Sequence, residues 1–266
     1  MTGHDEPPPP PTPPPSTTDE AAHAAMHERM RARTGQHAVP AWLRQTAGEP
    51  RWQAMLAVAV LVALQLRLPA ELSAQMAMPG GLDDYGRWVL PGVQVLLGLV
   101  LAVANPRRID HGSARLRSVS LVLLAVASVA NAVSAAMLVA TIVTGSPALG
   151  AQDVLLDGGT IWLTNILVFG LWYWELDRGG PAARARAERR HPDFLFPEMT
   201  NPQIAEPDWA PYVVDYLYVA FTNATAFSPT DTVPFSRWSK LMMTLQSLVS
   251  LAVGALVVAR AVNTLG

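Results

Sequence analysis

Residues 215–234 read DYLYVAFTNATAFSPTDTVP, and a long apolar segment from Trp238 to Asn263 follows them. The part from Tyr212 to Phe227 has helical character, but at about 1.5 Å per residue its length of about 24 Å is short for a membrane span. Asp215 and the threonines make it too polar to face lipid, and Pro229 ends it. We therefore expect a re-entrant or interfacial helix, because irregular backbone at membrane depth needs protein or water around it.

Four further apolar segments come before this C-terminal hairpin. The chain is 50% hydrophobic and only 15% charged, whereas soluble domains carry about 25% charge. The segments are long enough, with their flanking aromatic residues, to cross about 30 Å of hydrocarbon. They run from Trp52 to Leu68, Trp88 to Ala104, Val119 to Val143 and Thr160 to Trp174, and the final helix, Leu241 to Val262, is the fifth. The predicted fold is an all-α membrane protein with about five transmembrane helices, the short re-entrant or interfacial helix and a disordered, proline-rich N-terminal tail.

Arginine clusters alternate with acidic connections along the chain. Arginines gather before the first apolar segment, between the second and third, and after the fourth, while the other two connections hold mostly Asp and Glu. This alternation predicts a cytoplasmic N-terminus by the positive-inside rule. Four regions follow: a cytoplasmic tail with a short basic helix (1–51), a four-helix transmembrane region (52–176), a basic and then proline-rich cytoplasmic loop (177–211), and the hairpin (212–266).

The side on which the C-terminus lies depends on the hairpin. If residues 212–228 are re-entrant, they enter from the cytoplasmic face and the C-terminus lies outside. If they span the membrane, the chain has six helices and the C-terminus returns inside. The five prolines between His191 and Pro211 block a continuous helix, so we expect an extended surface strap before the hairpin.

The N-terminal tail carries two runs of proline, residues 7–11 and 13–15. Such a run is disordered or adopts a polyproline II conformation. We expect a solvated tail, and the alternative is that it docks in an aromatic groove on a cytoplasmic protein partner. A short helix is expected behind it, beginning after Thr18 and reaching Arg33.

Composition argues against several classes of function. The chain has no cysteine, so disulfides, thiolate chemistry and cysteine metal sites are excluded. A net charge of −2 gives no basic footprint for nucleic acid. The sequence contains no metal cluster, no Ser/His/Asp spacing and no phosphate loop. We therefore expect neither an enzyme nor a cofactor, and no catalytic or metal-binding residue is predicted.

Polar residues within the apolar segments point to helix packing. Asn131 lies at the middle of the third segment and Asn165 in the fourth, while Gln246 and Ser250 lie on the last helix. Such side chains form hydrogen bonds between helices in a bilayer, and Asn165 and Thr164 are the expected partners of Asn131. A substrate contact is the alternative for Asn131.

Residues 215–263 resemble the pore helix, filter and inner helix of the potassium-channel superfamily. The residues that match in order are Tyr218, Phe221, Thr222, Thr225, Asp231 and Pro234. The resemblance implies a pore-like hairpin whose lining groups are Thr222, Asn223, Thr225, Ser228 and Asp231. The filter departs from the family, because residues 226–230 contain Pro229 and no glycine, so potassium selectivity is not implied.

The whole chain resembles a group of bacterial integral membrane proteins, of actinobacterial type, that carries no assigned activity. The residues in common are the block from Phe221 to Asp231 and the terminal stretch from Ala259 to Asn263. This resemblance implies a bacterial plasma-membrane location.

Two functions remain open at this stage, beside an enzyme, which the sequence supports least. One is a multipass plasma-membrane scaffold or regulatory protein, which is consistent with the proline-rich tail, the basic loops and the altered filter. The alternative is an ion-channel-like protein with a degenerate, non-glycine filter, which would form a homo-oligomer around the turn at residues 222–231. In both cases the lipid bilayer is the expected surrounding.

Overall fold

The computed structural model describes residues 39–67, 83–104, 108–109, 114–144, 151–201, 203–225 and 231–265. The chain divides into two units, Met1–Pro40 and Ala41–Gly266, and of the first unit only residues 39 and 40 are described. The predicted proline-rich tail, the short basic helix and Ser228 therefore lie outside the described residues.

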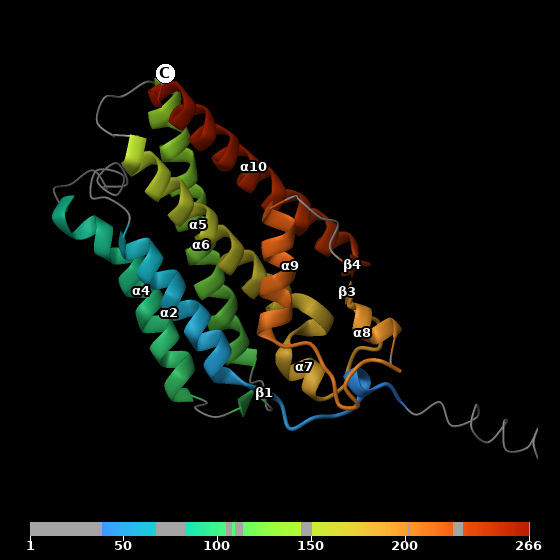
Figure 1. Cartoon of the computed structure of the whole chain (residues 1–266). Coiled ribbons are helices and arrows are strands. Elements are labelled where there is room, and N and C mark those ends of the chain that lie inside the picture. Colours follow the sequence, from blue (N-terminus) through green and yellow to red (C-terminus); the bar gives the residue numbers. More distant parts are fainter. Residues whose placement is uncertain are drawn as a thin grey trace, which may run out of the picture. The chain divides into compact units, whose positions relative to one another are not determined.

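The second unit is built from helices (Figure 1), as the sequence predicts. Its described residues form eight α-helices: α2 (Arg51–Arg67), α4 (Asp83–Ala104), α5 (Ala114–Thr144), α6 (Ala151–Leu176), α7 (Pro181–Ala185), α8 (Pro197–Thr200), α9 (Val213–Thr225) and α10 (Arg237–Leu265). Two 3-10 turns, η1 (Ala41–Leu43) and η2 (Asp177–Gly179), accompany them. Two short antiparallel strand pairs join distant segments: β1 (Glu49–Pro50) with β2 (Arg108–Ile109), and β3 (Phe194–Leu195) with β4 (Val233–Pro234).

Three described helices, and not five, are long and apolar enough to cross a membrane. These candidate spans are Leu116–Thr144, Gln152–Gly179 and Arg237–Arg260. α2 has 17 residues, so it measures about 26 Å at about 1.5 Å per residue, less than the roughly 30 Å of a hydrocarbon core. In α4 the described apolar stretch is Gly92–Leu101. The prediction of about five transmembrane helices is therefore wrong in number.

α6 is the central helix of this unit. It packs against α2, α5, α9 and α10, and 67% of its apolar window is buried, against 22% for α10. It begins at Ala151, nine residues before the predicted Thr160, because Asp153 occupies its first turn. A carboxylate there is stabilised by the helix dipole, so the acidic connection expected before the fourth segment is partly helix.

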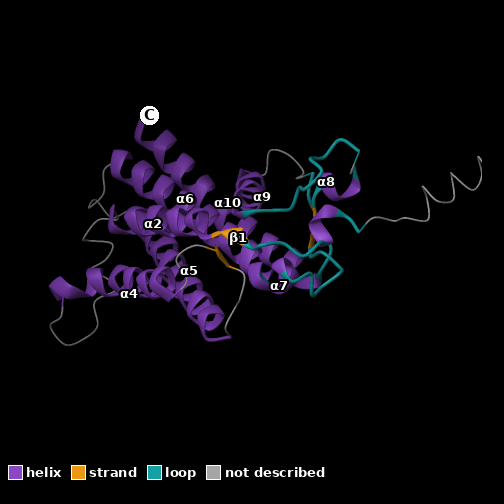
Figure 2. Ribbon diagram, turned by 90° about the horizontal axis from the view of Figure 1, so that it is seen from below, coloured by secondary structure: helices purple, strands orange, loops and turns teal. Residues whose placement is uncertain are grey.

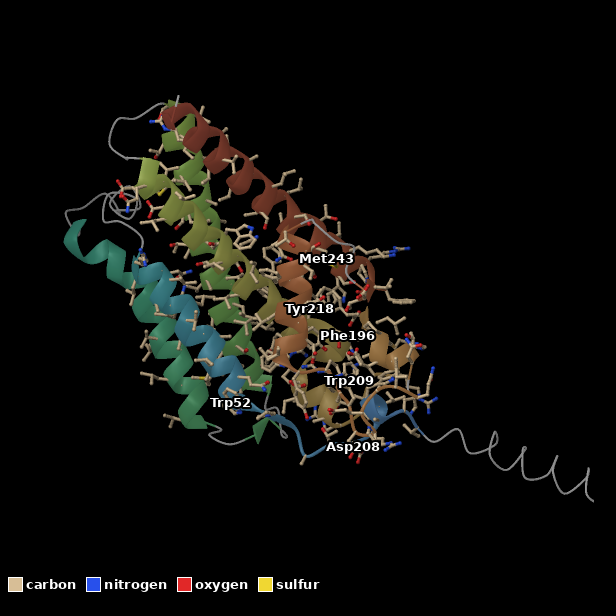
Figure 3. The ribbon with its side chains drawn as sticks, in the orientation of Figure 1. Trp52, Phe196, Asp208, Trp209, Tyr218 and Met243 are labelled. Carbon is tan, nitrogen blue, oxygen red and sulfur yellow. The ribbon has the colours of Figure 1, made fainter. Side chains whose placement is uncertain are left out.

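α9 and α10 run in the same direction. Near their first turns, Tyr216 of α9 and Trp238 of α10 both pack against Phe194, with ring centroids 6.2 and 5.7 Å away. Further along, the Asn223 amide of α9 donates to the Met243 carbonyl oxygen of α10 at 2.9 Å. Both helices therefore have their first turns near Phe194, and Met243 of α10 lies beside the part of α9 that follows Tyr218 (Figure 3). With 13 residues, α9 is also far shorter than a span.

The strap before α9 is anchored in the core at its start, while most of residues 203–208 are exposed, as expected for a surface segment. Phe194 and Phe196 are buried, and their ring centroids lie 5.0 Å from that of Tyr173 and 5.3 Å from that of Tyr216 respectively. Trp209 packs against Phe196 from further along the strap. Figure 2 shows the loops gathered with α7 and α8 at one end of the helices. Burial of these aromatic side chains therefore holds parts of the strap against the core.

The crossing of α6 and α9 depends on a glycine. A Cβ atom added at Gly170 would lie 2.6 Å from Leu217 Cδ2 and 3.1 Å from Leu217 Cα. Because one of these atoms belongs to the backbone, a side-chain rotation alone cannot make room. Gly170 therefore lets α9 approach α6 closely.

We predict that Gly170→Ala lowers the free energy of unfolding by about 1–3 kcal/mol, the usual cost of overpacking. Gly159→Ala on the same helix is the matched control, since its added Cβ would meet no heavy atom within 4 Å. The control should be neutral or stabilising by up to about 1 kcal/mol, because alanine favours a helix over glycine. Unfolding by SDS in mixed micelles measures both variants, and equal effects would contradict the close crossing.

Candidate functional site

A single glutamine ties the short helix α9 to its neighbours. Gln246 of α10 is fully buried. Its Oε1 accepts hydrogen bonds from the Tyr173 hydroxyl at 2.7 Å and from Asn223 Nδ2 at 2.8 Å. Its Nε2 donates to the Ala220 carbonyl oxygen at 2.7 Å. One side chain thus connects α6, α9 and α10, and buried amides of this kind need such partners.

Of the predicted turn residues, Asn223 takes part in this junction. Its amide donates to Gln246 and to the Met243 carbonyl, and its Oδ1 accepts from the Ser247 hydroxyl at 3.1 Å. Asn223 therefore joins two helices through both ends of its side chain.

The other predicted turn residues lie apart from that junction. Thr222 Oγ1 donates to the carbonyls of Tyr218 and Val219 at 3.0 and 3.1 Å, and Thr225 Oγ1 donates to the Thr222 carbonyl at 3.0 Å. These are bonds to the helix's own backbone, common for threonine within helices. Asp231 is exposed.

The predicted packing residues fall into two places. Asn165 of α6 donates to Ser250 Oγ at 2.9 Å and to the Gln246 carbonyl at 3.3 Å, so these three residues meet at the α6–α10 contact. Asn131 is buried on α5. The expected pairing of Asn165 with Asn131 is therefore replaced by a pairing with α10.

A buried ion pair, not anticipated from the sequence, lies where α6 gives way to α7. Arg184 Nε and Nη2 donate to Glu49 Oε1 at 2.9 and 2.8 Å, and both side chains are almost entirely buried. Trp174 Nε1 donates to Glu49 Oε2 at 2.5 Å. Burial acts to lower the pKa of Arg184, but the Glu49 carboxylate raises it overall, so the guanidinium stays protonated.

Asp177 provides a second buried carboxylate next to this ion pair. We call Glu49, Asp177, Arg178 and Arg184 together the ionic cluster. Asp177 Oδ1 accepts the backbone N–H groups of Asp193 and Phe194 at 2.9 and 3.3 Å, and its Oδ2 accepts the Tyr216 hydroxyl at 2.6 Å. Arg178 Nε lies 3.5 Å from Oδ2. The carboxylate thereby holds the strap and α9 to the end of α6.

The backbone at this end is unusual. Arg178 has φ 51°, in the left-handed region that L-residues rarely adopt. Its N–H donates to Asp193 Oδ2 at 2.9 Å, and its Nη1 donates to the Trp42 carbonyl at 2.7 Å. These bonds hold the strained conformation in place. The sequence contains one signal for this end of α6, the Gly179-Gly180 pair, which is typical of the end of a helix. The charged residues around it read only as those of a loop.

A cavity of about 530 Å³ lies beside the ionic cluster, between α2, α5, α6 and α7. Four arginines line it: Arg51, Arg117, Arg186 and Arg189. Glu175 also lines it, accepting a hydrogen bond from Ser120 at 3.2 Å and lying 3.9 Å from Arg117 Nε. Arginines from three separate sequence clusters thus meet at one end of the helices.

Comparison with family models, with curated proteins and with solved structures finds no match. Three apolar helices of spanning length suggest a membrane location. Among the described residues, no group of three or more His, Asp and Glu side chains is placed to hold a metal ion. The hairpin, the ionic cluster and the cavity are therefore the features of the structure that bear on function.

We predict that Arg184→Ala lowers the free energy of unfolding by about 3–5 kcal/mol, because it leaves the Glu49 carboxylate buried without its partner. Arg190→Ala is the control, as it removes an exposed arginine from the same basic segment. It should change stability little. SDS titration of the purified protein measures both, and a small loss for Arg184→Ala would show that Glu49 is not held by this pair.

Proposed function

We propose that this protein is a multipass plasma-membrane scaffold or regulatory protein that does not conduct ions. The observation that supports this most directly is that Asn223, one of the candidate lining residues, bridges α9 and α10. A pore needs polar groups directed at the permeating ion, whereas both ends of the Asn223 side chain are bonded to α10.

In this proposal α9 is a re-entrant half-helix. Its 13 residues are too few to span, and β4 pairs with β3 at the level where α9 begins. The positive-inside rule favours a cytoplasmic position for the arginine-lined end of the helices. The N-terminus then lies in the cytoplasm and the C-terminus outside.

The second candidate is an ion-channel-like protein with a degenerate filter. The parallel course of α9 and α10 favours it, since a half-helix followed by a returning segment and a spanning helix is the layout of a pore hairpin. A recess of about 400 Å³ next to Asn223, lined also by Thr244 and Ser247, provides polar groups on the outer side of this hairpin. Conduction would require several copies to meet around it.

We predict that single cysteines at Tyr212 and Phe235 react from the same side of the membrane. Both residues are exposed, and the chain contains no cysteine of its own, so unmodified protein provides a blank background. Labelling of right-side-out and inverted vesicles with an impermeant maleimide measures the side. A cysteine at the exposed Thr144, at the far end of α5, should react from the other side. Labelling of positions 212 and 235 from opposite sides would make α9 a span.

We expect the purified full-length protein in liposomes to give no more K⁺ or Na⁺ flux than empty liposomes. Asn223→Ala removes the hydrogen bonds of Asn223 to Ser247 and Gln246. The same flux measurement on this variant tests whether those bonds keep a pore closed. Flux above background from the wild-type protein would overturn the non-conducting role and establish the channel-like one.

The scaffold role requires a protein partner, and the proline-rich tail is the proposed binding segment. Affinity purification of the full chain and of a chain lacking residues 1–18 tests this. A partner recovered with the full chain and lost with the shortened one is expected. Identical partners from both would contradict a role for the tail.

A further inference from the structure

The cavity beside the ionic cluster separates charged from apolar side chains. Its charged part consists of Arg51, Arg117, Arg186 and Arg189 with Glu175 and Glu188. Its apolar part is formed by side chains of α2, α4, α5 and α6, among them Met55, Leu101, Leu124 and Leu171. A volume of about 530 Å³ falls within the usual range of about 300–1,000 Å³ for ligand sites.

The charged part carries a positive excess. Four arginines face two glutamates, and each glutamate has an arginine neighbour: Arg117 Nε lies 3.9 Å from Glu175, and Arg186 Nε lies 2.6 Å from Glu188. Four positive and two negative charges leave a net charge of +2. Guanidinium groups pair with phosphate oxygens through two parallel hydrogen bonds, which suits them to a phosphate head.

The apolar part favours a ligand with a hydrocarbon chain over a small free anion. Leu101, Leu124 and Leu171 are almost fully buried, so the part of the lining that they form is apolar. α2 and α4, which contribute to this wall, also carry apolar residues that are more than two-fifths exposed, among them Leu56, Val60, Leu99 and Val103. The helices that form this wall therefore also present apolar surface suited to lipid.

We propose that this cavity binds an anionic phospholipid, with its phosphate among the arginines and an acyl chain against the leucines of α5 and α6. Basic pockets between membrane helices are known to receive anionic lipid headgroups. Arg186 and Arg189 lie beyond the end of α7 and close the site from the side of the ionic cluster. This inference goes beyond the proposed scaffold role and does not depend on it, because lipid binding and ion flux are separate measurements.

The test uses the full chain in detergent micelles and counts bound lipid by native mass spectrometry. The probes are phosphatidylglycerol and phosphatidylcholine, with glycerol 3-phosphate and inorganic phosphate as competitors that lack acyl chains. We expect phosphatidylglycerol to bind and phosphatidylcholine to bind far more weakly. We expect millimolar amounts of either competitor to leave phosphatidylglycerol bound.

Variants locate the site. R186Q/R189Q should weaken phosphatidylglycerol binding at least about tenfold, since it removes two charge-assisted partners of the phosphate. R190Q/R237Q is the matched control, because it removes two exposed arginines that do not line the cavity. It should change binding less than about threefold. Met55→Trp, which fills the apolar part, should weaken lipid binding with all the arginines intact.

The outcomes separate the alternatives. Equal losses in both double variants would show general attraction of anionic lipid to a basic surface and would overturn the site. Displacement of phosphatidylglycerol by glycerol 3-phosphate or inorganic phosphate would overturn the lipid assignment in favour of a free anion. Binding unaffected by Met55→Trp would remove the acyl chain from the cavity. Thermal unfolding of each variant without lipid confirms that it is folded, so that a loss of binding is assigned to the site.

Discussion

The carboxylate of Asp177 is the point from which the C-terminal half of the molecule is positioned. It lies fully buried at the end of α6 and accepts hydrogen bonds from the strap at Asp193 and Phe194 and from Tyr216 of α9. Asp193 in turn binds the start of α10, because its carboxylate accepts the Trp238 indole N–H at 2.8 Å. Both helices of the hairpin therefore begin at a level set by one side chain.

This arrangement explains how a helix as short as α9 keeps its place. A half-helix cannot be held by matching the thickness of the bilayer, as a spanning helix is. Its position must come from protein contacts at both ends. Tyr216 bonds to Asp177 at the first end, and Asn223 and Gln246 bond to each other near the second. Close approach at Gly170 brings the helix against α6 between them.

Local chemistry determined which features were predictable. The helix expected at Tyr212 to Phe227 is observed over the described residues as Val213–Thr225, and Pro211 precedes its first turn. The number of spans was overestimated because an apolar stretch such as Trp52–Leu68 has the same sequence pattern whether it crosses a bilayer or packs against a neighbouring helix. The ionic cluster could not be predicted, since Glu49, Asp177 and Arg184 are far apart or read as loop charges, and only the tertiary fold buries them.

A buried ion pair is a costly way to gain stability, because desolvation offsets much of the attraction between the charges. The ion pair instead fixes the local geometry, because few positions of the Arg184 side chain allow it to donate to Glu49 and to the Trp174 and Asp177 carbonyls together. That constraint fixes α7 against the start of α2 and so sets where Arg186 and Arg189 stand relative to Arg51 and Arg117. The arginine-lined cavity is thus a consequence of the same cluster that positions the hairpin. A ligand bound there would contact α2, α5 and the α6–α7 junction together, so its binding energy would add to the forces that hold these elements in one arrangement.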